Sequence, residues 1–295
     1  MSINFTPNDL FLKSELTNRL VTLENYLDAD IMAFTGAISE LFVPKVFAII
    51  EDLAISPQKK DKIFIILKTP GGSAEAVERY VNILRNHYTT VNFIVPDYAY
   101  SAGTIFCMSG DNIYMDYYSV LGPIDPQVQN KDGRWVAALG YLDKLNELLL
   151  KAQNRTMSDA EFIVFKEFDL AEIRGYEQAR DLTVDLLKRW LVKYKFVNWN
   201  FHETTPDLLG QPVTLEQKEE RAADVAKLLG DTSRWKSHGR PINMEILRSE
   251  MKLKIEDFSL DATLNGLIRS YYNFSNDYLK NLSHEQNFIH TRNFI

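Results

Sequence analysis

The chain has 295 residues, 45% of them hydrophobic, and its 33 Lys and Arg against 40 Asp and Glu give a formal net charge of -7. A chain of this length buries a full core without disulfides or metal ions, and its single cysteine, Cys107, excludes a disulfide framework and a cysteine-rich zinc site. The excess of acidic residues and the lack of long Lys and Arg runs argue against a protein whose main task is to bind nucleic acid.

The N-terminal residues do not read as a signal peptide, because no basic segment precedes an apolar stretch. The best candidate for a membrane span, residues 31–50, is interrupted by Glu40, Pro44 and Lys45, and is therefore interpreted as a strand followed by a helix. We expect a cytoplasmic protein without a membrane span and without a nucleic-acid partner.

Residues 30–129 alternate short apolar runs with amphipathic stretches, which is typical of repeated β-α units around a parallel sheet. The clearest strand is KIFIILK, a β-branched run that ends in a Thr-Pro-Gly-Gly turn. A helix is expected to begin directly on those glycines, because apolar residues then recur at helical spacing. The expected elements are strands at 31–34, 62–68, 91–95, 113–115 and 119–121, and helices at 40–53 and 73–87.

The second half of the chain is mainly helical in pattern. Residues 141–153 and 158–192 are rich in Leu, Glu, Lys and Arg, which favour helices. A connector at 196–213 leads to a charged helix at 214–229. Residues 261–295 are rich in aromatic residues and Asn, and we expect them to form a helix and a tail.

Two turns of small residues lie where an expected strand ends and an expected helix starts, at 69–72 and at 98–104. Backbone N–H groups at such turns bind phosphates or oxyanions. The first turn lacks the Lys-Ser/Thr pair of a phosphate loop and the three glycines of a dinucleotide site, so nucleotide binding is not expected. In the second turn, Ser101 is followed by Ala102 and Gly103, which leave room for a substrate backbone. By local pattern Ser101 is either reactive or a helix N-cap, and the turn does not match the Gly-x-Ser-x-Gly elbow of the α/β-hydrolases.

These turns belong to a longer series of motifs. The series is Thr69-Pro70-Gly71-Gly72, Val95-Pro96, Ala99-Tyr100-Ser101-Ala102-Gly103-Thr104, Leu121-Gly122-Pro123-Ile124-Asp125-Pro126-Gln127 and, further on, Arg234-Trp235, His238 and Pro241-Ile242. In this order and spacing it resembles the SDH (serine dehydrogenase proteinase) family of Clp-fold serine proteases, distant relatives of ClpP and of signal peptide peptidase A. The family name is historical and implies no redox activity.

The resemblance implies an α/β fold, a ClpP/crotonase-like spiral of β-α units with a helical extension. We expect five parts in the chain: an N-terminal segment at 1–29, the α/β core at 30–133, a helical region at 134–200, the C-terminal part of the catalytic domain at 201–260, and a C-terminal extension at 261–295.

The resemblance also implies an activity, that of a serine peptidase that cleaves peptide bonds through an acyl-enzyme on Ser101. The backbone N–H groups of Gly72 and Ala102 would form the oxyanion hole, and Gly71 and Gly103 would support the two turns. The implied substrate is a peptide or an unfolded protein, the implied assembly is a homo-oligomer, and no metal ion or organic cofactor is implied. An activating partner is left open. Unlike ClpP, the chain has a long helical region after the core, which is a candidate cap that would limit substrates to unfolded segments or short peptides.

A serine needs a base to take its proton, and here the chain departs from ClpP. The place of the ClpP histidine falls at Ile124 or Asp125, and no histidine is nearby. His238 lies close to the segment that supplies the aspartate in ClpP. We therefore predict a triad of Ser101, Asp125 and His238, since a triad is defined by geometry and not by chain order. The plainer alternatives are that His238 is a solvated loop residue and that Asp125 forms a turn or a helix cap.

Other functions are weighed beside the triad. The signal peptide peptidase relatives use a Ser-Lys dyad, for which Lys166 and Lys144 are the candidates. A crotonase-type acyl-CoA enzyme would use the same oxyanion hole without Ser101. A catalytically inactive binding or assembly module is the third alternative, motivated by the missing histidine. Metal binding is not expected, because His202, His284 and His290 lack paired ligand spacing, and Cys107 is interpreted as a buried core residue.

Overall fold

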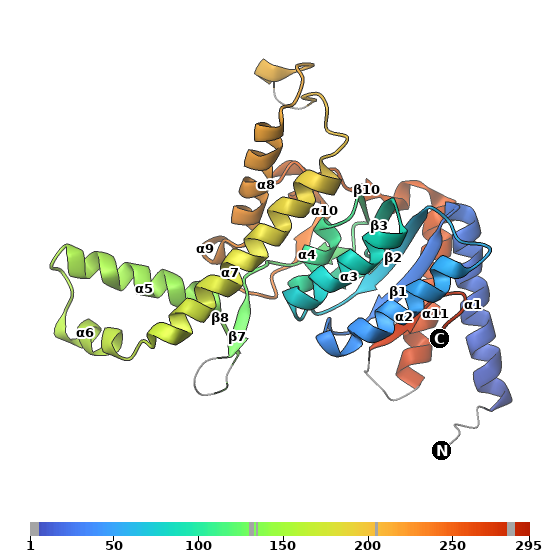
Figure 1. The fold of residues 1–295 in the computed structure, drawn as a ribbon, viewed down its shortest axis with the longest axis horizontal. Coiled ribbons are helices and arrows are strands. Elements are labelled where there is room, and N and C mark those ends of the chain that lie inside the picture. Colours follow the sequence, from blue (N-terminus) through green and yellow to red (C-terminus); the bar gives the residue numbers. More distant parts are fainter. Residues whose placement is uncertain (1–5, 130–132, 134, 204–205, 282–286) are drawn as a thin grey trace.

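A six-stranded sheet forms the centre of the fold, in the order β10-β5-β3-β2-β1-β11 (Figure 1). Neighbouring strands run parallel, except that β11 runs antiparallel to β1. The structure is a computed structural model that describes residues 6–129, 133, 135–203, 206–281 and 287–295. The strands of this sheet are β1 (Asp30–Thr35), β2 (Lys62–Lys68), β3 (Thr90–Ile94), β5 (Asn112–Met115), β10 (Glu256–Asp257) and β11 (Phe288–His290).

Helices cover both faces of the sheet. Because successive side chains of a strand point to opposite faces, Ile63, Ile65 and Leu67 of β2 share one core with the first helix pair, α2 and α3. Phe64 and Ile66 share a second core with the other pair, α1 and α11. The four helices are α1 (Pro7–Leu27), α2 (Val43–Ile55), α3 (Ala74–His87) and α11 (Ala262–Asn281). No helix in the described part of the chain is long and apolar enough to cross a membrane.

A small second sheet, in the order β4-β6-β9, stands beside the central one. The strand β4 (Tyr98–Ala99) runs parallel to β6 (Val120–Leu121), and β9 (Ile242–Asn243) pairs antiparallel with β6. Helix α4 (Ala102–Met108) follows β4, and its buried Thr104 hydroxyl donates to the carbonyl of Gly122 at 2.9 Å. This hydrogen bond ties α4 to the residue that follows β6. This sheet therefore gathers segments from three distant parts of the chain.

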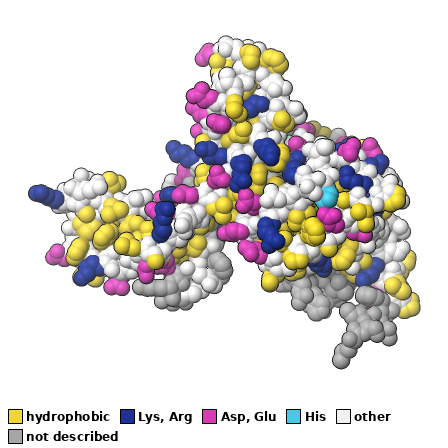
Figure 2. Space-filling view, in the orientation of Figure 1, with side chains coloured by type: hydrophobic (Ala, Val, Ile, Leu, Met, Phe, Trp, Pro, Cys, Tyr) yellow, Lys and Arg dark blue, Asp and Glu magenta, His cyan; other side chains and the backbone are white. Residues whose placement is uncertain are grey.

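An arm of three helices projects from the α/β body (Figure 1). The arm begins with the hairpin β7–β8, and its helices α5 and α7 pack on each other through Leu142, Ile173 and Tyr176. Apolar side chains gather on the arm surface (Figure 2), and three in succession on α6 are more than half exposed: Phe162, Ile163 and Val164. The arm consists of β7 (Gln127–Gln129), β8 (Trp135–Ala137), α5 (Ala138–Gln153), α6 (Asp159–Lys166) and α7 (Leu170–Trp190).

Most expected elements are confirmed, and the expected strand at 62–68 has the bounds of β2. The expected helix at 40–53 begins as a 3-10 turn, η1 (Glu40–Phe42), because Pro44 occupies the first turn of α2 and favours a helix start there. The helical stretch at 158–192 is two helices, since Asp169 caps the start of α7 by accepting from the N–H groups of Ala171 and Glu172. The remaining elements are the π-helical turn η2 (Leu191–Lys195), η3 (Pro206–Leu208), α8 (Leu215–Leu229), α9 (Thr232–Trp235), α10 (Met244–Ser249) and η4 (Phe258–Leu260).

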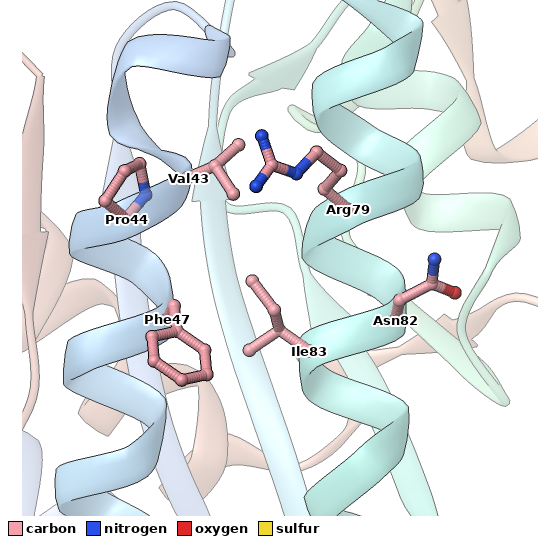
Figure 3. A pocket seen from close by; sticks show the side chains of 6 residues that line it. All are labelled: Val43, Pro44, Phe47, Arg79, Asn82 and Ile83. Carbon is pink, nitrogen blue, oxygen red and sulfur yellow. The ribbon is translucent and has the colours of Figure 1, made fainter.

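A shallow pocket of about 420 Å³ lies between α2 and α3 (Figure 3). Val43 and Ile83 point into the space between the two helices, whereas Asn82 points away from it. Phe47, which also lines the pocket, is 51% exposed. None of the residues singled out by the sequence motifs lines this pocket, so the candidate site lies elsewhere.

Candidate active site

Ser101 sits in a strained turn between β4 and α4. Its backbone angles are φ 52° and ψ -117°, a region that residues with a side chain rarely adopt. Although Ser101 occupies the N-cap position of α4, its side chain makes no capping hydrogen bond, so the N-cap interpretation does not account for it. In the α/β-hydrolases the nucleophilic serine also lies on a strained turn between a strand and a helix, although the residues that flank it differ from those beside Ser101.

The Ser101 turn and the double-glycine turn touch each other. Gly71 has φ +108°, and a Cβ added there would lie 2.8 Å from the Cβ of Ser101. Gly72 has φ +145°, and its Cβ would lie 1.9 Å from the carbonyl oxygen of Ile38. Glycine is therefore required at both positions by conformation and by space. On the other side of the contact, a Cβ at Gly103 would lie 2.3 Å from Thr69 Cγ2.

Two backbone N–H groups at these turns are available to a ligand. Within the described ranges, neither the N–H of Gly72 nor that of Ala102 donates a hydrogen bond to another residue. Both residues line the same cavity as Ser101. Ala102 is buried, where donors are normally paired, whereas Gly72 is exposed. Two free donors beside a hydroxyl suit a developing oxyanion.

Asp125 and His238 form a direct hydrogen bond, with 2.7 Å between His238 Nδ1 and Asp125 Oδ1. The side chain of Asp125 is 6% exposed and that of His238 is 29% exposed, so the carboxylate is buried and the ring reaches the cavity. The segment before Asp125 is held by the N–H of Ile124, which donates to the carbonyl of Leu229 at the end of α8. Gln127 Nε2 donates to the other oxygen, Asp125 Oδ2, at 3.0 Å.

The cavity that joins these groups has a volume of about 630 Å³. Ser101, Gly72, Ala102 and His238 all line it, whereas the Asp125 carboxylate stands behind the ring of His238. The arm helix α7 covers one side of the cavity with Ala179, Leu182 and Thr183. Its remaining lining residues are Ile38, Ser39, Pro70, Ser73, Ala74, Glu75, Ile105, Ile124, Pro126, Gln127 and Val128.

The two lysines considered for a dyad lie away from this cavity. Lys166 is the last residue of α6 and is exposed on the arm. Lys144 is exposed on α5 and pairs with Glu147 at 2.9 Å. Neither lysine is among the residues that line the cavity. The charged side chains that do line it are Glu75 and, when protonated, His238.

The other expected features are ordinary structural ones. Cys107 is fully buried, and burial raises the pKa of its thiol well above the usual range, so it is an unreactive core residue. His202 contacts Gln217 at 3.2 Å, and His290 is buried beside Tyr271, while His284 lies outside the described residues. Over the part of the chain that the structure describes, no group of three or more His, Cys, Asp or Glu is arranged to hold a metal ion.

One part of the site was not predicted, and another was predicted only in outline. Gln127 stands in one of the quoted motifs, but a glutamine alone gives no signal of its partner. The helical region after the core was a candidate cap over the site, and α7 of that region lines the cavity. Which helix does so was not predicted, because an amphipathic pattern shows that a helix has a buried face but not what that face covers.

Comparison with known proteins bears on the part of the site that holds Ser101 and Asp125, because the matching family model ends before His238. The sequence model of the ClpP-like SDH-type serine proteinase family matches residues 45–197, just over half of the chain. The uncharacterized protein MJ0137 of Methanocaldococcus jannaschii is 31% identical over 180 residues, which are 58% of this chain and 56% of that protein. The uncharacterized protein MJ1495 of the same organism is 41% identical over 66 residues, 22% of this chain and 23% of that protein. The chain thus matches little more than half the length of the first relative and about a quarter of the second.

Two solved structures show a weaker likeness. A mutant of the membrane-bound stomatin-specific protease 1510-N, in complex with a substrate peptide, has a TM-score of 0.44 and 15% identity, and the match covers 76% of this chain and 72% of that one. The ClpP protease catalytic domain from Plasmodium falciparum has a TM-score of 0.32 and 16% identity, and the match covers 60% of this chain and 90% of that one. Likeness at this level does not identify an activity.

Proposed function

The chain belongs to the family of ClpP-like SDH-type serine proteinases, and on this premise we propose that it cleaves peptide bonds through an acyl-enzyme on Ser101. The observation that carries the proposal is the 2.7 Å hydrogen bond between His238 and Asp125, with the ring of His238 lining the same cavity as Ser101. A buried carboxylate behind an imidazole, in a cavity with a strained serine, is the arrangement that activates a serine hydroxyl.

The proposed reaction starts with the tautomer of His238. When Nδ1–H donates to Asp125, Nε2 carries a lone pair that accepts the proton of the Ser101 hydroxyl. Ser101 Oγ then bonds to the substrate carbonyl carbon, and the carbonyl oxygen becomes an oxyanion that accepts hydrogen bonds from the N–H groups of Gly72 and Ala102. Each such donor contributes roughly 3 kcal/mol to the transition state.

The second half of the proposed reaction returns the proton. His238 donates it to the leaving amine as the C–N bond breaks, which leaves an acyl group on Ser101. A water molecule, deprotonated by His238, then attacks the acyl carbon. The bond from the acyl carbon to Ser101 Oγ breaks, His238 returns the proton to Oγ, and the acid product leaves. Asp125 stays ionised throughout and stabilises the charged ring.

The Ser-Lys dyad is the weaker alternative, because Lys166 and Lys144 are exposed on the arm and do not line the cavity. We further propose that the substrate enters as an extended or unfolded segment, since three residues of α7 line one side of the cavity that holds Ser101. A homo-oligomer remains part of the proposal on family grounds.

Labelling with a fluorophosphonate serine-hydrolase probe tests the proposal. We expect the wild-type protein to be labelled, Ser101→Ala and His238→Ala not to be labelled, and Lys166→Ala to be labelled like the wild type. Circular dichroism checks that each variant is folded. A folded wild-type protein that is never labelled would favour an inactive binding module, and loss of labelling in Lys166→Ala alone would establish the dyad.

A further inference from the structure

The carboxylate of Asp125 is held at both oxygens by two different side chains. His238 Nδ1 lies 2.7 Å from Oδ1, and Gln127 Nε2 lies 3.0 Å from Oδ2. An ionised carboxylate only accepts hydrogen bonds, so the end of the Gln127 amide that faces it is the NH₂ group. Hydrogen bonds to charged groups are among the stronger ones in proteins.

Gln127 comes from a well-anchored position. It is the first residue of β7 and pairs with Ala137 in β8, and the N–H of Ala138 donates to the carbonyl of Pro126 at 2.9 Å. Its backbone is therefore fixed on both sides by the root of the arm. Gln127 also lines the cavity, so its side chain stands between the cavity and the buried carboxylate.

We infer that Gln127 is a positioning residue, whose amide keeps Asp125 Oδ1 directed at Nδ1 of His238. This inference rests on the proposed function. The last torsion of an aspartate is soft, so a carboxylate with one partner turns freely toward any other donor. With Oδ2 held by Gln127, the carboxylate plane is fixed and the ring keeps the tautomer that leaves Nε2 free for Ser101.

The variants Gln127→Ala and Gln127→Glu separate positioning from a merely structural role, and Gln129→Glu is the matched control. Gln129 is an exposed glutamine two residues further along β7. We expect Gln127→Ala to lower kcat on a fluorogenic peptide about tenfold with KM unchanged within about twofold, because the carboxylate loses one charge-assisted hydrogen bond.

The second readout does not depend on activity. Nuclear magnetic resonance follows the titration of the His238 ring, assigned among the five histidines by comparison with His238→Gln. In Gln127→Glu a second carboxylate beside Asp125 stabilises the protonated ring, so its titration moves to higher pH by on the order of one unit. The other charged side chain that lines the cavity, Glu75, is present in every variant.

Identical His238 titrations in the wild type, Gln127→Glu and Gln129→Glu would overturn the inference, as would an equal shift in the two glutamate variants. A shift confined to Gln127→Glu, together with the selective loss of kcat in Gln127→Ala, supports it. If the protein cleaves and labels nothing but the shift is confined to Gln127→Glu, the contact of Gln127 with the Asp125–His238 pair stands and it is the proposed function that fails.

Discussion

His238 and Asp125 are 113 positions apart in the sequence, yet their side chains meet at 2.7 Å. The small sheet explains how, since Asp125 follows β6, His238 precedes β9, and these two strands are neighbours. Ser101 follows β4 on the other side of β6. The three proposed catalytic residues are thus carried by three adjacent strands, and the site forms only when distant segments pair.

Replacing Asp125 tests the triad. We expect Asp125→Asn to lower kcat by about four orders of magnitude, because an amide favours the wrong tautomer of the ring. The double variant Asp125→Asn with Ser101→Ala should be no slower than Ser101→Ala alone, since the residues act as a unit. Steady-state kinetics on a fluorogenic peptide measures both. Additive losses would show that Asp125 acts separately from Ser101.

Removing the side chain of Ser101 should release backbone strain. Because φ at this position is 52°, we expect Ser101→Gly to raise the free energy of unfolding by about 1 kcal/mol over Ser101→Ala. Urea denaturation measures the difference. Both variants lack the hydroxyl, so equal stabilities would mean that the turn is not strained.

The double-glycine turn should tolerate no side chain. In Gly72→Ala the new Cβ meets the carbonyl oxygen of Ile38, and we expect a loss of at least about 2 kcal/mol in the free energy of unfolding. Gly175→Ala is the control, because Gly175 lies inside α7 with nothing within 4 Å of its added Cβ. That variant should gain about 0.5–1 kcal/mol from helix propensity. Thermal or urea unfolding distinguishes the two.

A large side chain on α7 should block the cavity without disabling the serine. We expect Ala179→Trp to lower kcat/KM for peptides at least about tenfold, because the indole fills space that the substrate needs. Labelling by a small fluorophosphonate should persist. Gln178→Trp, at an exposed neighbour on the same helix, should cleave like the wild type. Equal losses in both variants would point to a distorted helix and not to a blocked cavity.

Buried His290 should make stability depend on pH. Its ring lies between Tyr271 and Thr17, and burial lowers its pKa from the usual 6.5 to about 4. The unfolded chain therefore takes up the proton first, and the contribution to stability is complete above pH 6.5 and is lost as pH falls toward 4. The loss is at most about 3 kcal/mol.

Urea unfolding of the wild type and His290→Gln across this pH range measures the contribution. The variant lacks the titrating ring, so its stability should fall less between pH 6.5 and 4. Parallel pH dependence in the two proteins would assign the effect to other groups.

The central strands and the two turns were predictable from the sequence because their signals are local. The β-branched run of β2 and the glycines after it specify a buried strand and a tight turn without reference to the rest of the chain. Helix α1 also carried a local signal that was missed, a capping box between Thr6 and Asp9. The family motifs drew attention to Ser101, Asp125 and His238, and their roles stay predictions.

What the sequence did not reveal depends on distant contacts. The strand β11 has three residues and is defined by pairing with β1, so no periodicity marks it. The contact of Gln127 with Asp125, and which helix of the helical region lies over the cavity, depend on how elements pack. Side-chain partners of this kind follow from tertiary structure and leave no pattern in the chain.

The strand β11 also bears on how the protein is synthesised. It pairs with β1, although some 250 residues separate the two strands, and Arg292 just beyond it bonds to Glu24 and Asp30 at 2.9 and 2.8 Å. A nascent chain on the ribosome therefore carries the Ser101 turn long before the segment that completes the edge of the sheet has been translated. The sheet is complete only once that late segment has been made, and until then one side of β1 has no strand partner.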